Sequence, residues 1–226
     1  MATVGGLSVA IMQPYFLPYA GYFRLFASTD LFVIYDCVQF PRRGYVHRNQ
    51  LTDRHGHPQW LTLPLAHAPV ETSIRDLAFA PDAKARWQAA QTPFPLASRH
   101  EAAMQLASAM RCLGPTPVDY IVDLLKLSCS LLGLPWNVVR SSELAVPGTL
   151  RGQDRILEIA TRVGASRYVN APGGVGLYDP AAFARRGLEL CFLPSYDGPS
   201  PSILQRLCDQ DIADLRREFA GCRDVG

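Results

Sequence analysis

The sequence lacks the features of a membrane-spanning, secreted or nucleic-acid-binding protein. No uninterrupted apolar run reaches the roughly 18 residues that a membrane-spanning helix needs, and residues 1–6 carry no basic segment of a signal peptide. Lysine and arginine number 22 against 20 acidic residues, and no basic run is longer than two residues. We therefore expect a cytoplasmic protein whose partner is neither a membrane nor nucleic acid.

The chain also lacks a recognisable metal or disulfide pattern. Its six cysteines form no C-x-x-C pair and stand mostly among apolar residues, which is typical of reduced core thiols. His55 and His57 share a glycine-containing loop without a cysteine or carboxylate at ligand spacing, so we interpret both as solvated loop residues. The sequence therefore predicts no metal site.

The apolar pattern predicts a single α/β domain over residues 1–226. A chain of this length with 48% apolar and 19% charged residues buries roughly 70% of its unfolded surface, which is enough for one core. Residues 7–12 and 31–35 have the pattern of buried strands, and residues 18–27 between them have that of a helix. Together they predict a βαβ unit at the start of the chain.

The rest of the pattern predicts a hairpin and then alternating helices and strands. Two β-prone runs flank a polar loop, which predicts a hairpin over 44–65. Two Ala-rich helical windows, 82–91 and 99–113, are separated by a proline pair and predict a helical cover over 82–116. The later elements are helices at 117–132, 151–163, 179–186 and 201–219, and strands at 136–140, 167–170 and 189–193. This alternation predicts a mostly parallel, Rossmann-like sheet with a β-hairpin and a helical insertion.

The turn after the first predicted strand is the most informative segment. Gln13, Tyr15, Tyr19 and Tyr22 bring polar groups to a position where packing alone requires only Leu or Phe. In an open parallel sheet this turn borders a crevice at the carboxyl ends of the strands. We interpret the three tyrosines as ligand-binding and Gln13 as a catalytic candidate; a rigid, well-packed connection is the alternative. Asp36, at the end of the next strand, is the candidate general base, or else a structural cap.

The hairpin and a later glycine cluster supply further candidates. Arg43 and Arg48 are candidates for pairing with phosphate or carboxylate oxygens. An adjacent Arg48 and Asn49 in the middle of a hairpin are costly to bury without partners or a ligand. Gly173 and Gly174 follow a predicted strand, so we expect their backbone amides to contact phosphate or only to form a turn, since their spacing is not a dinucleotide fingerprint.

Several motifs are shared with a known family. The chain carries IMQPYFLPYAGYF at 11–23, FVIYD at 32–36, VQF at 38–40, RG at 43–44, RN at 48–49, WLTLP at 60–64, GASRY at 164–168 and GG at 173–174. Together these motifs resemble the WbqC-like family. The resemblance implies a protein encoded with O-antigen, capsule or amino-sugar biosynthesis, and it adds Gln39 to the ligand-binding candidates. Cys37 stands where that family commonly has a second Asp, and His47 where Asn is usual.

The layout of the first βαβ unit is also similar to that of HIGH-type nucleotidylyltransferases and pantoate-amine ligases. Those enzymes use two histidines at the helix start to stabilise triphosphate oxygens. Here Tyr19 and Tyr22 occupy the corresponding places, and a phenol is neutral at pH 7. The positive charge would have to come from Arg42, Arg43 or Arg48. The similarity implies a nucleotide cofactor, ATP or a sugar nucleotide, without fixing which.

The sequence leaves several functions open. The first is a transferase or amide-forming ligase that acts on a small anionic substrate, namely an amino sugar, a sugar nucleotide or an amino acid, in polysaccharide or secondary-metabolite biosynthesis. The second is a non-catalytic subunit that holds such an intermediate for a partner enzyme, and the third is a nucleic-acid-associated protein. A different chemistry would use Cys37 as nucleophile and His47 as its base. The oligomeric state is not predicted.

Overall fold

The computed structural model describes residues 6–199 and 201–222. Five strands form the central sheet in the order β5-β2-β1-β6-β7. Their bounds are β1 (Ser8–Met12), β2 (Leu31–Ile34), β5 (Val138–Arg140), β6 (Arg167–Asn170) and β7 (Glu189–Phe192). Every pairing within this sheet is parallel, so the predicted Rossmann-like fold class is confirmed.

The strand order places a topological switch point beside β1. Strands β2 and β5 follow on one side of β1, whereas β6 and β7 lie on its other side. The connections that leave the ends of β1 and β6 therefore diverge and open a crevice at the carboxyl edge of the sheet. This is the place where an open α/β sheet most commonly binds its ligand.

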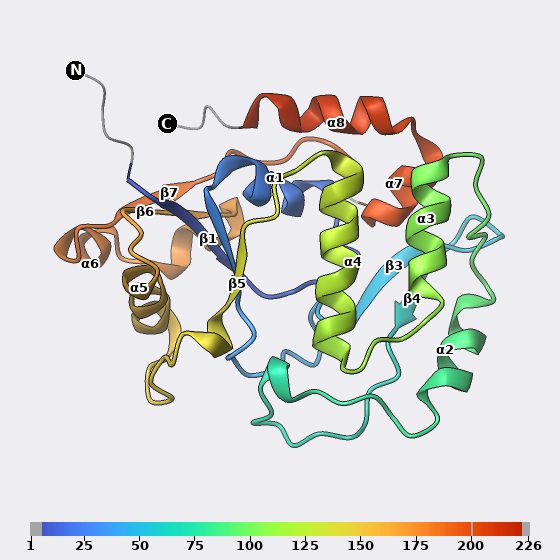
Figure 1. The fold of residues 1–226 in the computed structure, drawn as a ribbon, viewed down its shortest axis with the longest axis horizontal. Helices are drawn as coiled ribbons and strands as arrows, with labels where there is room; N and C mark the ends of the chain where they lie inside the picture. The colour runs from blue at the N-terminus through green and yellow to red at the C-terminus, as the bar shows by residue number, and fades with distance from the viewer. Residues whose placement is uncertain (1–5, 200, 223–226) are drawn as a thin grey trace.

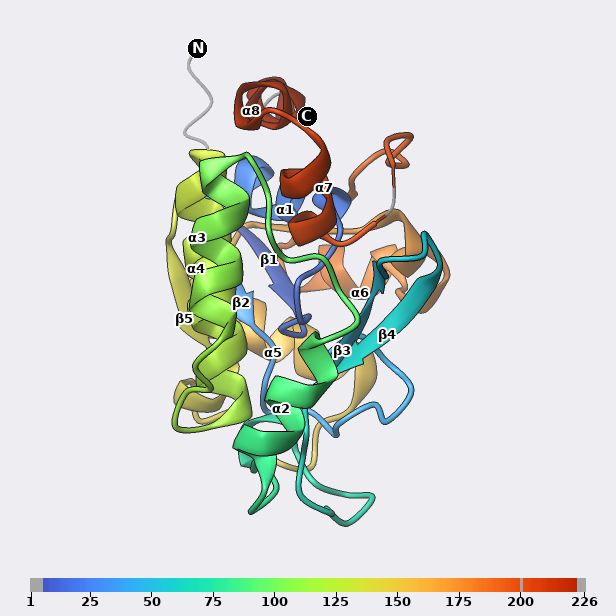
Figure 2. The same cartoon turned by 90° about the vertical axis from the view of Figure 1, so that its right-hand side faces the viewer.

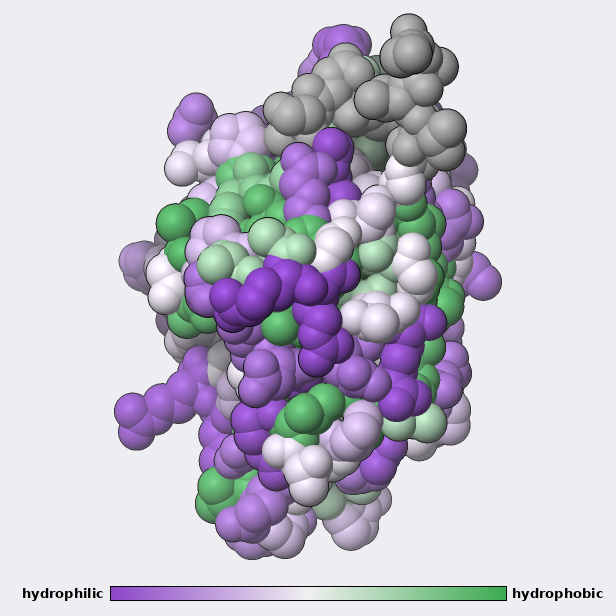
Figure 3. Space-filling view, turned by 90° about the vertical axis from the view of Figure 1, so that its left-hand side faces the viewer, coloured by the Kyte–Doolittle hydropathy of each residue, from purple (hydrophilic) through white to green (hydrophobic). Residues whose placement is uncertain are grey.

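Helices cover both faces of the sheet (Figure 1). One face carries α1 (Ala20–Ser28) and α4 (Pro117–Leu132). The other face carries α5 (Gly152–Arg162) and α6 (Pro180–Arg185). On the side where α5 and α6 lie, Figure 3 shows hydrophilic side chains across the middle, with apolar side chains in separate smaller patches. The sheet is thus the middle of three layers.

The alternation of side chains along β1 explains the two cores. Val9 and Ile11 are buried in the cluster beneath α5, whereas Ala10 joins the larger cluster beneath α1 and α4. A strand with both faces covered needs apolar residues at consecutive positions, because neighbouring side chains point to opposite faces. The predicted strand at 7–12 and helix at 18–27 agree with the structure to within two residues.

The ends of α4 have clear sequence causes. The Thr116 hydroxyl accepts a hydrogen bond from the backbone N–H of Asp119 at 3.1 Å, which caps the first turn. Pro117 occupies the first helical position, where its missing N–H costs nothing. Gly133 ends the helix with a φ of 71°, a left-handed conformation that glycine adopts without strain.

The hairpin lies apart from the central sheet (Figure 2). Its strands β3 (Arg48–Thr52) and β4 (Pro58–Thr62) pair with each other in antiparallel fashion, as predicted. The helices α2 (Ala83–Gln91) and α3 (Glu101–Met110) follow. Trp87 of α2 is fully buried, and its indole N–H donates to the Met110 carbonyl at 2.7 Å. This bond joins the two helices across the proline-containing break.

One prediction about the C-terminal segment is wrong. The helix expected over 201–219 is two helices, α7 (Ile203–Asp209) and α8 (Ile212–Ala220), because Gln210 is extended and the Asp211 carboxylate caps α8 by accepting from the Ala213 N–H at 2.8 Å. The glycine cluster, for which a turn was one expectation, lies in a short 3₁₀ helix. The 3₁₀ helices are η1 (Ile74–Asp76), η2 (Ser141–Glu143) and η3 (Pro172–Leu177).

Candidate functional site

Two adjoining cavities lie at the switch point and share Tyr15 and Tyr19. One, of about 410 Å³, is bordered by the residues that end β1 and follow β6, including Met12 and Gly173. The other, of about 570 Å³, extends along the hairpin and is lined by Tyr45 among others. We call the two together the tyrosine groove. Its combined size suits a small organic ligand.

The turn between β1 and α1 is held in place by hydrogen bonds that shape the groove. The buried Tyr22 hydroxyl donates to the Gln13 carbonyl at 2.8 Å. The Asn49 side-chain amide donates to the carbonyls of Phe16 at 3.1 Å and Leu17 at 2.6 Å. Leu17 has a φ of 47°, which is strained for a residue with a branched side chain. Asn49, which lies in the hairpin strand β3, therefore stabilises a turn that is otherwise unfavourable.

A row of aromatic rings begins in the groove, at Tyr15 and Tyr45, and continues beyond its lining to Trp60. The ring centroids of Tyr15 and Tyr45 lie 5.9 Å apart, and those of Tyr45 and Trp60 are also 5.9 Å apart. Tyr45 and Trp60 remain 48% and 42% exposed, which is unusual for such large rings. The Arg48 guanidinium lies over Trp60, 4.3 Å from the ring centroid. Solvent therefore reaches ring faces that a flat ligand can cover.

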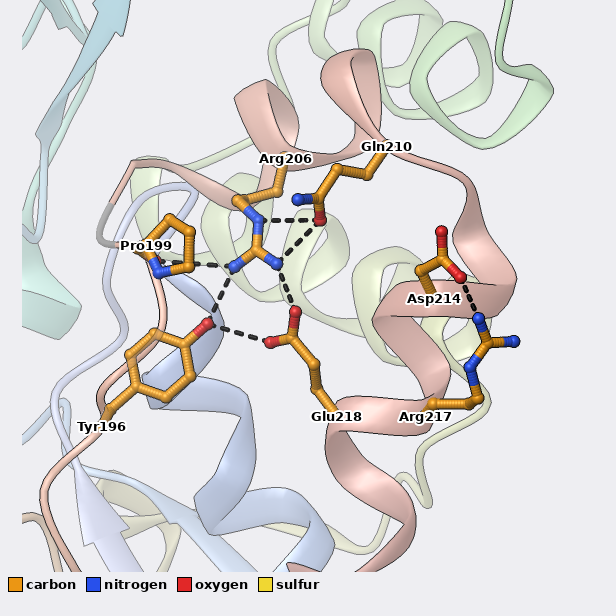
Figure 4. A network of polar contacts seen from close by, with 7 residues as sticks. All are labelled: Tyr196, Pro199, Arg206, Gln210, Asp214, Arg217 and Glu218. Carbon is orange, nitrogen blue, oxygen red and sulfur yellow. Dashed lines mark hydrogen bonds and ion pairs between the residues drawn. The ribbon is translucent and has the colours of Figure 1, made fainter.

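The part of the groove beside Tyr19 depends on a buried polar network that the sequence did not predict (Figure 4). Arg206, only 3% exposed, donates to the Tyr196 hydroxyl at 2.8 Å and to the Gln210 side chain, and it pairs with Glu218. The Tyr196 hydroxyl in turn donates to Glu218 at 2.9 Å. The Tyr196 ring, thus held, lines the groove 5.7 Å from Tyr19. No local sequence motif predicts this network, because its members lie in a loop and in both C-terminal helices.

The tyrosine groove is polar but uncharged. Among the described residues that line it, none carries a carboxylate, ammonium, guanidinium or imidazole group. Burial raises the pKa values of Tyr15 and Tyr22 above that of a free phenol, so both hydroxyls stay protonated at neutral pH. The groove therefore offers hydrogen bonds and ring faces rather than charge.

Comparison with known proteins identifies the family of the chain. The model of the WbqC-like protein family matches residues 13–200. The chain belongs to the WbqC-like protein family. It is similar to "Uncharacterized protein Rv1507c" of Mycobacterium tuberculosis strain H37Rv, with 29% identity over 206 residues that cover 84% of this chain and 83% of the relative. No solved structure matches the chain.

The structure of this WbqC-like chain contains neither a membrane-spanning helix nor a metal-type cluster within its described residues. None of the helices over 6–199 and 201–222 has the length and apolarity that crossing a bilayer requires. The same residues contain no grouping of three or more His, Cys, Asp or Glu side chains suited to a metal ion. All six cysteines are free thiols.

Asp36 lies outside the tyrosine groove, in a setting that does not fit the predicted general base. Asp36 is completely buried. Its carboxylate accepts a hydrogen bond from the Ser141 hydroxyl at 2.9 Å, one from the Ser142 N–H at 2.9 Å and one from the Ser142 hydroxyl at 2.8 Å. These bonds join the end of β2 to η2 after β5. The alternative of a structural cap describes this geometry better.

The predicted arginine contacts do not form in the tyrosine groove either. Arg48 lies on Trp60 and donates to the Arg43 carbonyl at 3.1 Å, while Arg43 itself is exposed; neither lines the groove. Arg42 donates to the Ala68 carbonyl at 2.5 Å at a different cavity. Because no arginine is among the described residues that line the tyrosine groove, the anion site expected beside the tyrosines does not form there.

Cys37 and His47 line separate cavities, which does not support their pairing as nucleophile and base. Cys37 and Gln39 border one of about 370 Å³, whereas His47 borders another of about 310 Å³. Burial, with a smaller effect of Arg48, lowers the pKa of His47 to about 4, so its ring is neutral at pH 7. Gln39 also donates to the Val70 carbonyl at 2.8 Å.

The two candidate glycines differ. Gly173 borders the groove, with open space where a Cβ would stand. Gly174 is buried against Asn170, where a Cβ would clash with the side-chain amide. Gly173 is therefore the one whose backbone a ligand can approach, whereas Gly174 is required for packing.

Proposed function

We propose that this WbqC-like protein binds a small polar organic compound in the tyrosine groove and acts on it as a transferase or amide-forming ligase. The substrate is an amino sugar, a sugar nucleotide or an amino acid. The proposal rests on one observation: a phenol-lined, uncharged groove lies at the switch point of a parallel sheet, the usual ligand site of this architecture.

The chemistry of the groove favours a hydroxylated ring. The exposed face of Tyr45 can cover the apolar face of a sugar or stack on a nucleobase. Protonated phenols such as Tyr15, together with the side chain of Gln50, can hydrogen-bond to ring hydroxyls or amides. A nucleotide, either ATP or a sugar nucleotide, is the proposed source of the activated group.

A second candidate is a subunit that binds an intermediate without transforming it. It is favoured by the absence of any carboxylate, imidazole or thiol among the described residues lining the groove. Such groups supply general bases and nucleophiles with pKa values near neutrality, and a buried phenol does not. Under this candidate a partner enzyme supplies the reactive groups.

Calorimetric titration and product analysis test both candidates. The ligands are N-acetylglucosamine, uridine, UDP-N-acetylglucosamine and a mixture of amino acids with ATP. We expect binding of at least one ring compound, weakened about tenfold by Tyr45→Ala because a stacking contact contributes about 1–3 kcal/mol. Met104→Ala is the matched control, since Met104 is 46% exposed on α3, outside the groove.

The outcomes separate the candidates. Turnover detected by mass spectrometry supports the enzyme, and binding without turnover in the presence of ATP supports the binding subunit. Failure of every ring compound to bind, or equal weakening by Tyr45→Ala and Met104→Ala, contradicts the assignment of the groove.

A further inference from the structure

The cavity that contains Cys37 is lined by arginines and lies apart from the tyrosine groove. It has a volume of about 370 Å³ and forms where the carboxyl end of β2 meets the N-terminus of α5. Arg75, Arg151 and Arg155 line it together with a single acidic residue, Glu71. It shares no lining residue with the tyrosine groove. We call it the arginine cavity.

Arg155 is the anchor of this cavity, and its charge is not neutralised within the described part of the chain. It is only 7% exposed. Its guanidinium donates to the carbonyls of Leu150 at 2.9 Å, Cys37 at 2.6 Å and Gly148 at 3.2 Å, but no carboxylate of residues 6–199 or 201–222 forms an ion pair with it. A buried cation without a counter-charge is costly, so an anion in the cavity would relieve that cost.

The start of α5 adds partial positive charge to the same cavity. Its cap residue, Arg151, forms no side-chain capping bond, and Gly152 lines the cavity with open space where a Cβ would stand. The first N–H groups of a helix lack intrahelical partners and are oriented toward an anion at its N-terminus. The backbone at Gly152 is therefore accessible to a ligand oxygen.

The charge balance selects the kind of anion. Three arginines and one glutamate give the lining a formal charge of +2, or +1 when Asp76, which pairs with Arg75 at 3.6 Å, is counted with them, so the cavity has a net positive charge in either case. A phosphoryl group carries about −1.5 to −2 at pH 7, whereas a carboxylate carries only −1. Guanidinium groups also match phosphate oxygens with paired hydrogen bonds. We propose that the arginine cavity is a binding site for a phosphoryl group.

Arg155 also has a structural role, because it ties the loop at 148–150 to the residue after β2. Its removal would therefore confound binding with folding. The test instead uses Arg75 and Arg151, whose side chains are largely exposed: Arg75 pairs with Asp76 at 3.6 Å, and Arg151 donates to the nearby Leu150 carbonyl at 2.8 Å. Neither holds another element of the fold in place through its side chain.

The experiment titrates inorganic phosphate and adenosine 5′-monophosphate into the full chain by calorimetry, at constant ionic strength maintained with sodium chloride. The variant Arg75→Ala/Arg151→Ala is compared with Arg185→Ala/Arg217→Ala. The second pair removes the same charge from exposed positions on α6 and α8. We expect saturable binding of phosphate, weakened about tenfold or more by the first pair and by less than twofold by the second.

Each outcome decides the proposal. Equal affinity for the two ligands supports a site for the phosphoryl group alone, and tighter binding of the nucleotide supports the same site with added contacts to the nucleoside. Binding of neither ligand, or equal losses in the two double variants, overturns the proposal. Because the tyrosine groove contributes no lining residue, this result is independent of the function proposed for it.

Discussion

The tyrosine groove and the arginine cavity lie along the same carboxyl edge of one sheet, yet they are built for different chemistry. The groove presents phenols, amides and exposed rings without a charged side chain, whereas the cavity presents three arginines and only one glutamate. The sequence suggested that Arg42, Arg43 or Arg48 supplies positive charge beside the tyrosines. The fold instead separates the phenol-lined groove from the arginine-lined cavity, since the arginines near the tyrosines lie on Trp60 or in solvent.

The largest expected effect is on the free energy of unfolding and concerns Asp36, whose hydrogen bonds join the end of β2 to η2. Asp36→Ala should lower the free energy of unfolding by about 3 kcal/mol, because it leaves the buried Ser141 hydroxyl and the Ser142 N–H without an acceptor. Chemical denaturation measures this change, and Asp36→Asn should lose less. If Asp36→Ala lost catalytic turnover while its stability was unchanged, the result would support Asp36 as a general base instead.

Arg206 is predicted to affect the groove and not the cavity. Arg206→Met removes a buried cation that holds Tyr196 and Glu218, which should cost about 3 kcal/mol of stability. It should also weaken ring-compound binding, while phosphate affinity stays within twofold. Calorimetry measures both affinities at a temperature where the variant is folded. An equal loss of phosphate binding would show that the two regions are not separate.

Asn49 should have a smaller effect on stability, confined to the turn that borders the groove. Asn49→Ala removes the donor to the Phe16 and Leu17 carbonyls and should cost about 2 kcal/mol. Because Leu17 is strained, the turn should relax and weaken ligand binding in the groove. Hydrogen exchange of the 13–19 segment is the measurement. Unchanged exchange in Asn49→Ala would contradict the role assigned to this amide.

The smallest predicted effect comes from His47, which lies outside both regions. Its pKa in the folded protein is about 4, below the ordinary value of 6.5, so the unfolded chain binds the proton more tightly. The resulting stability is fully present above about pH 6.5 and is lost as the pH falls through 4, by about 1–2 kcal/mol after allowance for solvent screening. Denaturation of wild type and His47→Asn at pH 7 and 4.5 measures it. The same pH dependence in both proteins would contradict the prediction.

The fold was largely predictable because its signals are local. Consecutive apolar residues in β1, the Thr116 cap and the left-handed Gly133 each act within a few residues. The break between α7 and α8 was missed, although Asp211 is a good helix cap, because the apolar spacing continues across it.

The candidate site was predictable only in part. The tyrosines were identified from their position after β1, and five of the predicted residues border the groove: Tyr15, Tyr19, Tyr22, Asn49 and Gly173. Tyr196 and Arg206 were missed because their contacts depend on the packing of the C-terminal helices. The hydrogen bonds that favour a structural cap over a general base at Asp36 were not predictable, because its partner Ser141 lies 105 residues further along the chain. Such long-range partners leave no spacing pattern in a single sequence.

A crossed titration tests the separation of the two regions most directly. Uncharged N-acetylglucosamine or uridine and inorganic phosphate are each titrated into Tyr45→Ala and into Arg75→Ala/Arg151→Ala. The account predicts that Tyr45→Ala weakens only the uncharged ring compound and that the arginine variant weakens only phosphate, each by about tenfold. Loss of phosphate binding in Tyr45→Ala together with normal binding in the arginine variant would contradict it.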